Sequence, residues 1–172
     1  MASALREKYL YERYSARLLA VCKRYLGSRD DAEDVLHDAF ITIFKNIDEA
    51  EYRGEEKLYA WMRRVAVNKC IDWLRRRKRD PLPLDEAPDQ PDEGDSGGLR
   101  KIPPEVLFGM IEALPEGYRT VFNLFCLDGY SHAEIAEMLD IKEKTSSSQY
   151  LRARRLLAQN INDYLAHGGK EQ

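Results

Sequence analysis

Apolar residues recur at three- and four-residue steps along most of the chain, which is typical of amphipathic helices. This spacing runs over residues 9–79, resumes near Pro104 and continues to about Leu165. No strand-like alternation and no internal repeat competes with it. The pattern therefore predicts an all-α protein with helices at both ends of the chain.

A segment of different composition separates the two helical stretches. Residues 80–98 contain four prolines, three glycines and seven acidic residues, and no basic residue. Such a segment cannot bury enough apolar surface to fold alone. We therefore expect two small helical domains, residues 1–79 and 103–172, joined by a flexible acidic linker over residues 80–102.

Composition narrows the class of protein. The 172 residues are 44% hydrophobic and 33% charged, a balance typical of globular domains. No apolar run approaches the roughly 20 residues that cross a bilayer, and the N-terminal residues are too polar for a signal peptide. We expect a cytoplasmic protein.

The three cysteines, Cys22, Cys70 and Cys126, are odd in number, widely spaced and not arranged as C-x-x-C. We expect no disulfide framework and no zinc module, and interpret all three as small buried hydrophobic residues. No other pattern indicates a cofactor.

Residues 29–47 predict a helix with an apolar stripe on one face and acidic residues towards its start. The stripe consists of Ala32, Val35, Leu36, Ala39, Phe40, Ile43 and Ile47, and the acidic group of Asp30, Asp31, Glu33, Asp34 and Asp38. The acidic face is either solvated or a docking surface, to which Ile41 or Phe44 adds an apolar contact. Asp34 or Glu33 together with His37 also suggests a metal site, but the chain lacks the second Glu-x-x-His helix of di-metal bundles. Asp34, His37 and Asp38 suggest a small helical enzyme, but no nucleophile, phosphate loop or metal set supports it. We expect no metal and no enzyme activity.

Residues 63–79 hold eight basic residues against the single acid Asp72, with Trp61 and Trp73 on the same predicted helix. Charge this concentrated is typical of a phosphate-binding surface. Its core side is less regular, and we expect Trp61 or Met62, Val65, Ala66, the stem of Lys69, and Ile71 or Trp73 to contribute. Tryptophan often serves packing alone, but basic and aromatic residues together suit separated DNA strands. The candidate residues are Trp61, Arg64, Asn68, Lys69, Arg75 and Arg76.

The C-terminal stretch predicts a helix-turn-helix. Ser131 and Glu134 form a capping box that starts one helix, and a second helix follows from about Glu143. On the second helix we expect Tyr150, Ala153, Leu157, Ile161 and Tyr164 to be buried, with Ser147, Ser148, Leu151, Arg152 and Arg155 opposite. Small hydroxyls and arginines are what a recognition helix in a major groove requires, although a helical hairpin in any bundle has a similar pattern.

Several strings closely resemble the extracytoplasmic-function (ECF) class of bacterial sigma factors, over almost the whole chain outside the linker and termini. They are DAEDVLHDAF at residues 31–40, WMRRVAVN at 61–68, DWLR at 72–75, LPEGYR at 114–119, GYS at 129–131, EIA at 134–136 and RAR at 152–154. Their order and spacing carry the resemblance.

The resemblance implies a role for each domain. In the family, an acidic helix docks on the clamp helices of the largest polymerase subunit, and Asp34, His37, Asp38 and Phe44 occupy the matching positions. Asn68 matches a residue that binds an unpaired base of the minus-ten element, with the loop of residues 52–58 near its pocket. The minus-thirty-five element is expected to be read by Ser147, Ser148, Gln149 and Arg152.

Two departures from the family pattern leave the preferred promoter open. Ser147 stands where many relatives carry arginine, and Asp140 where glycine is common.

The expected partners are the RNA polymerase core and promoter DNA, without a small-molecule substrate, and an anti-sigma factor is left open. The family threads its linker through polymerase channels, where these carboxylates would mimic phosphates. The alternative is a helix-turn-helix regulator without polymerase, which leaves the basic tryptophan helix unexplained.

Overall fold

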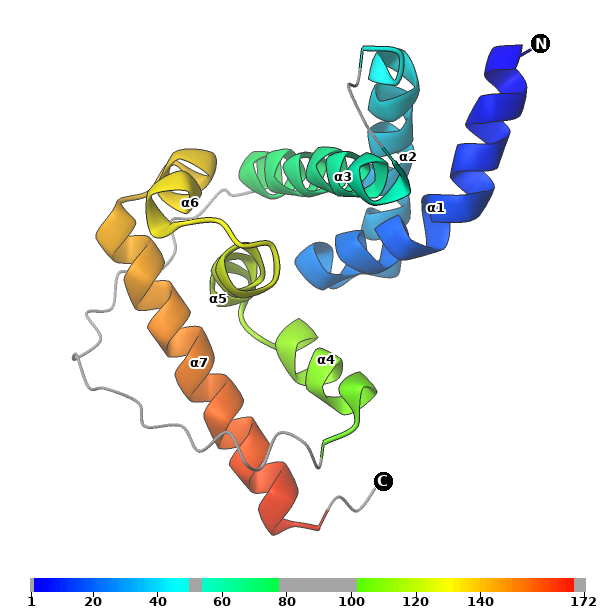
Figure 1. Cartoon of the computed structure of the whole chain (residues 1–172). Coiled ribbons are helices and arrows are strands. Elements are labelled where there is room, and N and C mark those ends of the chain that lie inside the picture. The colour runs from blue at the N-terminus through cyan, green and yellow to red at the C-terminus, as the bar shows by residue number, and fades with distance from the viewer. Residues whose placement is uncertain (1, 50–53, 78–101, 169–172) are drawn as a thin grey trace. The chain divides into compact units, whose positions relative to one another are not determined.

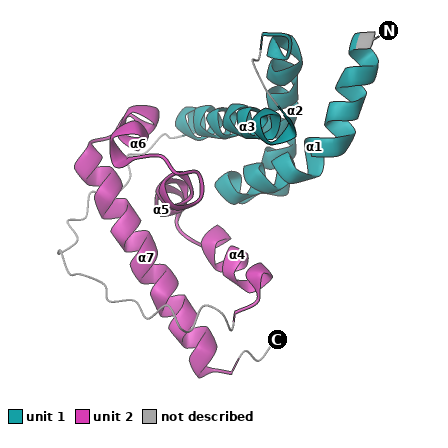
Figure 2. Ribbon diagram, in the orientation of Figure 1, with its two compact units in different colours: residues 1–79 teal, residues 80–172 magenta. Residues whose placement is uncertain are grey.

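The computed structural model describes residues 2–49, 54–77 and 102–168, which contain seven α-helices and one π-helical turn and no strand (Figure 1). The prediction of an all-α fold is confirmed. The chain divides into two compact units, Met1–Arg79 (unit 1) and Asp80–Gln172 (unit 2), coloured separately in Figure 2. The predicted acidic linker falls outside the described residues except for Ile102, so its bounds stay a prediction.

Unit 1 consists of α1 (Ala2–Leu26), α2 (Arg29–Asn46) and α3 (Glu55–Arg77). Ser28 caps α2 by accepting a hydrogen bond from the Asp31 amide. All seven residues of the apolar stripe predicted for α2, from Ala32 to Ile47, are at most 5% exposed. Helix α1 contacts α2 and its Leu18 and Cys22 are buried as well, so the core of unit 1 follows from helical periodicity.

The core side of α3 differs from the prediction. Its buried residues are Leu58, Met62, Ala66, Val67, Cys70, Ile71 and Leu74, whereas Trp61, Val65, Lys69 and Trp73 are half-buried. Met62, Ala66 and Ile71 were predicted correctly, and the half-buried Lys69 is compatible with the inward stem expected of it. The prediction of Val65 as a core residue was wrong, since Val65 is half-buried. The buried residues follow one another at steps of four, three and one residues. The half-buried tryptophans next to them made the buried face hard to identify from the sequence.

The three cysteines do not share one environment. Cys22 and Cys70 are buried as predicted, but Cys126 is exposed, so the prediction for this residue is wrong. Cys126 lies in the π-helical turn η2 (Asn123–Leu127), where Asn123 and Leu124 are the buried residues. The wider turn shifts the helical register, which turns Cys126 outward. Within the described part of the chain no three metal-ligating side chains come together.

Unit 2 contains α4 (Pro104–Glu112), α5 (Glu116–Phe122), α6 (His132–Leu139) and α7 (Glu143–Ala166), with η2 following α5. Its core joins Ile111 and Leu114 with Phe122, Ala153 and Leu157, so the long α7 packs on α4 and α5. The buried Arg119 guanidinium donates to the main-chain oxygen of Glu112 at 2.8 Å, which ties α5 to the end of α4. None of the helices in the described ranges is long and apolar enough to span a membrane.

The start of α6 has the predicted capping chemistry. The Glu134 amide donates to Ser131 Oγ at 3.2 Å, and the Ser131 amide donates to Glu134 Oε2 at 2.8 Å, which confirms the capping box. Asp140 ends α6 in the left-handed region, at φ 53°. Such a conformation favours glycine because a Cβ is crowded there, and this explains why glycine is common at the position in the related family.

Candidate nucleic-acid interfaces

The exposed face of α2 is acidic and is bordered by aromatic side chains. Asp34, His37 and Asp38 are exposed, and Phe44 is half-buried beside them on the same helix. The acids nearer the start of α2 have partners within unit 1: Glu33 pairs with Arg29 at 2.8 Å and Asp31 with Arg77 at 3.6 Å. The acidic surface that faces solvent therefore centres on Asp34 and Asp38.

A row of aromatic rings connects this acidic face to α1. The ring centroids of Tyr11 and Phe40 are 4.8 Å apart, and those of Phe40 and Phe44 are 5.5 Å apart. Tyr11 remains 43% exposed and Ile41 of α2 47% exposed. The charged face thus has an adjoining apolar edge that extends beyond α2, and sequence reasoning missed its α1 member because the contact spans the fold.

The DNA-binding candidates of α3 lie on its outward side. Trp61, Arg64, Asn68 and Arg75 follow one another at steps of three, four and seven residues, which keep them on one face of the helix. Arg64, Asn68 and Arg75 are exposed and Trp61 is half-buried. This places one indole, one amide and two guanidinium groups along a single stripe.

The second basic stripe of α3 lies beside the first. Lys69 is half-buried and Arg76, seven residues later, is exposed. The Arg77 guanidinium stands over the Trp73 ring at 5.0 Å, so one face of this indole is already covered. Trp61 is therefore the better candidate of the two for stacking on a base. Lys78 and Arg79 lie outside the described residues, as do the first residues of the loop 52–58 expected near the base pocket.

The outward face of α7 carries most, but not all, of the residues predicted for it. Ser147, Ser148 and Arg152 are half-buried, and Arg155 is exposed. Ser148 Oγ donates to the Lys144 main-chain oxygen at 2.9 Å, and Arg152 Nη1 donates to the Tyr118 hydroxyl at 3.3 Å. The Tyr118 contact ties Arg152 of α7 to α5.

The prediction that Gln149 faces DNA is not supported. Its side chain is only 6% exposed, and it belongs to an inward stripe with Ser146, Ala153 and Leu157. Steps of three, four and four residues place these residues on one face, so Gln149 is buried by its position on the helix. The expected core of α7 is otherwise confirmed at Ala153 and Leu157, whereas Tyr150, Ile161 and Tyr164 are half-buried.

His132 joins the two helices of the helix-turn-helix. Its ring stacks on Phe125 at a centroid distance of 4.3 Å, and its Nδ1 lies 2.9 Å from Oγ of the buried Ser146 on α7. Burial lowers the pKa of His132, and the nearby Glu143 carboxylate opposes this shift. The neutral ring is thus the form that fits between α6 and α7.

Comparison with known families matches both units. The family model Sigma-70 region 2 matches residues 10–80, and the model Sigma-70, region 4 matches residues 105–157. The ECF RNA polymerase sigma-E factors of Haemophilus influenzae and Escherichia coli (strain K12) are each 32% identical over 164 residues. The match covers 88% of this chain and 85% and 84% of those relatives.

A solved structure has the same fold. The sigma factor RpoE from Bartonella quintana, in a co-crystal structure with the anti-sigma factor NepR, aligns with a TM-score of 0.51 at 20% identity. The alignment covers 91% of this chain and 96% of that one. The chain belongs to the ECF class of the sigma-70 family of RNA polymerase sigma factors.

Proposed function

We propose that this chain directs the RNA polymerase core to specific promoters and assists promoter melting when transcription starts. The observation that carries this proposal is that unit 1 has two surfaces of opposite charge on different helices. One helix of the unit presents an acidic face with an apolar edge, and another presents a basic and aromatic face. A protein partner and a nucleic acid are the partners that these two surfaces fit.

The acidic face of α2 is the proposed polymerase-docking surface, with Asp34, His37, Asp38 and Phe44 as its contacts. Exposed carboxylates steer a basic partner into place during association. The aromatic edge supplies apolar area that can be buried in the bound complex. The edge includes Tyr11 of α1, because its ring packs on Phe40 while 43% of the residue stays exposed. We therefore add Tyr11 to the docking surface.

The outward side of α3 is the proposed minus-ten surface. Arg64, Lys69, Arg75 and Arg76 supply positive charge for the phosphates, and Trp61 supplies a ring for base stacking. Asn68 is exposed on the same face, where its amide can donate to and accept from one base edge. This combination suits an unpaired strand better than an intact duplex.

The start of α7 is the proposed minus-thirty-five surface. Ser147 and Ser148 are short, so the backbone can approach the major groove closely, while Arg152 and Arg155 reach further. Gln149 is left out of this surface because its side chain faces the core of unit 2. Since Ser147 replaces an arginine common in the family, Arg152 is the principal candidate for a guanine edge.

Further partners and location follow from this function. A protein that assembles with the polymerase core works in the cytoplasm as a binding protein, with no cofactor or small-molecule substrate of its own. Because the related RpoE structure contains the anti-sigma factor NepR, an anti-sigma partner is part of the proposal. The rival function, a helix-turn-helix regulator acting without polymerase, leaves the acidic face of α2 without a use.

In vitro transcription with purified core polymerase and a library of randomised promoters tests the proposal. We expect specific initiation only when the chain is present, and the selected sequences define its promoter. If the chain neither associates with core polymerase nor selects any promoter, the proposed function is wrong.

A further inference from the structure

The N-terminal helix α1 carries arginines on a single face, and no role has been assigned to them above. Arg6, Arg13, Arg17 and Arg24 follow at steps of seven, four and seven residues, which keep one side of a helix. The first three contact residues at the end of α2 or the start of α3. These two places are the ends of the connection between the two helices proposed to bind polymerase and DNA.

Arg6 holds the end that follows α2. Its Nη1 donates to Asp48 Oδ1 at 2.7 Å, across 42 positions of sequence. Asp48 belongs to the turn after α2, where the Glu49 amide donates to the Asn46 main-chain oxygen at 3.1 Å. The hydrogen bond from Arg6 lowers the pKa of Asp48 below its ordinary value, which favours the charged carboxylate.

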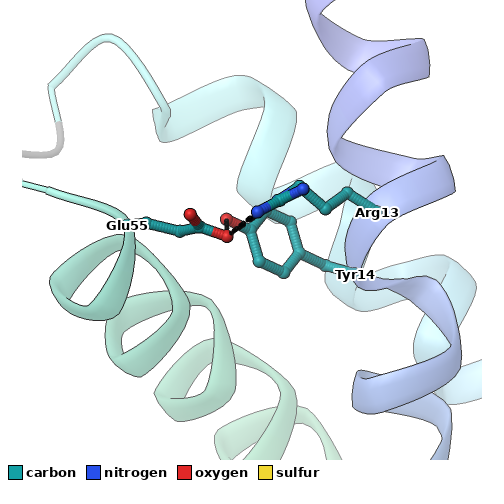
Figure 3. A network of polar contacts seen from close by, with 3 residues as sticks. All are labelled: Arg13, Tyr14 and Glu55. Carbon is teal, nitrogen blue, oxygen red and sulfur yellow. Dashed lines mark hydrogen bonds and ion pairs between the residues drawn. The ribbon is translucent and has the colours of Figure 1, made fainter.

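Arg13 holds the other end, where α3 begins. Its Nε donates to Glu55 Oε1 at 2.8 Å, its Nη2 contacts the same oxygen, and the Tyr14 hydroxyl donates to it at 3.4 Å (Figure 3). Glu55 is the first residue of α3 and follows Gly54, whose φ of 88° turns the chain into the helix. Hydrogen bonding to Arg13 lowers the pKa of Glu55.

A third contact between α1 and α3 lies one helical turn further along α3. The Arg17 guanidinium lies 3.7 Å from the centre of the Tyr59 ring, which also stacks on Tyr14 at 6.0 Å. Arg6 and Arg13 are seven residues apart and so about 10 Å apart along the α1 axis. One rigid helix therefore fixes Asp48, Glu55 and Tyr59 at defined separations.

Stability alone is a weak explanation for these ion pairs. The side chains of Arg6 and Asp48 are 39% and 77% exposed, and those of Arg13 and Glu55 are 45% and 55% exposed. Exposed ion pairs contribute little to the free energy of unfolding because water screens them. The Arg13 pair does restrict geometry, since Arg13 and the Tyr14 hydroxyl both bond to Glu55 Oε1 and leave this carboxylate few orientations.

We propose that Arg6 and Arg13 are positioning residues for minus-ten recognition, because their ion pairs with Asp48 and Glu55 fix where α3 begins relative to α1 and α2. This inference rests on the proposed function of the α3 surface. Displacing the start of α3 moves Trp61, Arg64 and Asn68 together, since they share one rigid helix. The arginines thus act through α3 and need not touch DNA.

Charge exchange within the Arg13 pair tests the inference. The variants are Arg13→Glu, Glu55→Arg and the double exchange, with Lys8→Glu as the matched control. Lys8 lies on the same helix and undergoes the same change of charge, and its ion pair with Glu12 at 3.7 Å stays within α1. Thermal unfolding and core-polymerase affinity are measured first, and we expect both to change little in every variant.

The readout is discrimination at the minus-ten element. Open-complex formation by the holoenzyme is measured on the promoter selected by the wild-type chain and on the same promoter with its minus-ten sequence scrambled. We expect Arg13→Glu to lower the ratio of the two about fivefold, within the range of measured pairwise couplings. The double exchange should restore most of the ratio, and Lys8→Glu should leave it unchanged.

Each other outcome has a defined meaning. Equal losses on both templates without recovery in the double exchange would make Arg13 a direct phosphate contact and overturn the inference. A ratio for Arg13→Glu equal to that of Lys8→Glu would overturn it as well. A wild-type holoenzyme that opens no promoter would instead overturn the proposed function, and the inference with it.

Discussion

Helices α2 and α3 share one hydrophobic core but present opposite charges to solvent. Between Arg29 and Asn46, α2 contains five acidic and two basic residues, whereas α3 contains seven basic and three acidic residues between Glu55 and Arg77. Their buried stripes are equally apolar, so the difference lies entirely in the outward positions. The net charge of −3 for the whole chain therefore describes neither surface.

A large effect is expected on the salt dependence of DNA binding by the basic surface. Replacing Arg64, Arg75 and Arg76 by glutamine removes three cations from the exposed side of α3. Each phosphate contact on single-stranded DNA contributes about 0.7 to the slope of log affinity against log salt. The triple variant should therefore lower the magnitude of the slope by about 2, measured by titrating holoenzyme with promoter DNA between about 50 and 200 mM salt.

The same titration also tests whether the two charged faces of unit 1 serve separate partners. Replacing Asp34 and Asp38 of α2 by asparagine changes the charge of the other surface and should leave the salt slope at its wild-type value. An equal change of slope in both variants would mean that the two faces do not serve separate partners.

In α7, the proposed recognition helix, we expect fewer side chains to contact DNA than in α3. Replacing Arg152 by alanine should cost roughly 1 to 3 kcal/mol of binding free energy if it contacts a base edge, with relaxed preference at one position of the minus-thirty-five element. Binding to a set of promoters, each altered at one position, measures this. A uniform loss across the set would make Arg152 a phosphate contact.

Two tyrosines of α1 test whether the docking surface extends beyond α2. Tyr11 packs beside Phe40 at the edge of the acidic face, whereas Tyr9 lies near Arg13 on the other side of the helix. Both are exposed, at 43% and 56%. Tyr11→Ala should weaken core-polymerase binding by about 1 kcal/mol, as expected for an interfacial tyrosine, and Tyr9→Ala should not. Equal affinities for the two variants would remove Tyr11 from the docking surface.

The smallest expected effect is a pH dependence in unit 2. Because burial holds the pKa of His132 below its ordinary value of 6.5, the unfolded chain takes up the proton first as pH falls. Stability contributed by the neutral ring is therefore present above about pH 6.5 and is lost as pH falls from there towards the folded pKa. Thermal unfolding between pH 8 and 5.5 should show this decline, and His132→Gln should flatten it. An unchanged decline in the variant would assign the effect to other groups.

Local sequence signals predicted much of the fold. The stripe from Ala32 to Ile47 follows from helical steps, and the capping box of Ser131 and Glu134 follows from residue types three positions apart. Both depend only on neighbours along one helix, which the sequence displays directly. The outward positions of Arg64 and Asn68 could be predicted for the same reason.

The remaining features depend on backbone register or on distant contacts. Cys126 is exposed because a π-helical turn shifts the register, and Gln149 is buried because the inward stripe of α7 begins at Ser146. The pairs of Arg6 with Asp48 and of Arg13 with Glu55 each join residues 42 positions apart. The seven-residue spacing of the arginines was visible in the sequence, but their partners were not.

A crossed measurement on unit 1 tests the central claim most directly. Core-polymerase affinity and open-complex formation at saturating protein are compared for Asp34→Lys/Asp38→Lys and for the triple glutamine variant of α3. We predict that the acidic-face variant binds core polymerase at least about 100-fold more weakly, since like charges at an interface cost several kcal/mol. We predict that the α3 variant binds core polymerase normally but fails to open the promoter. Loss of both properties in both variants, or of neither, would contradict the account.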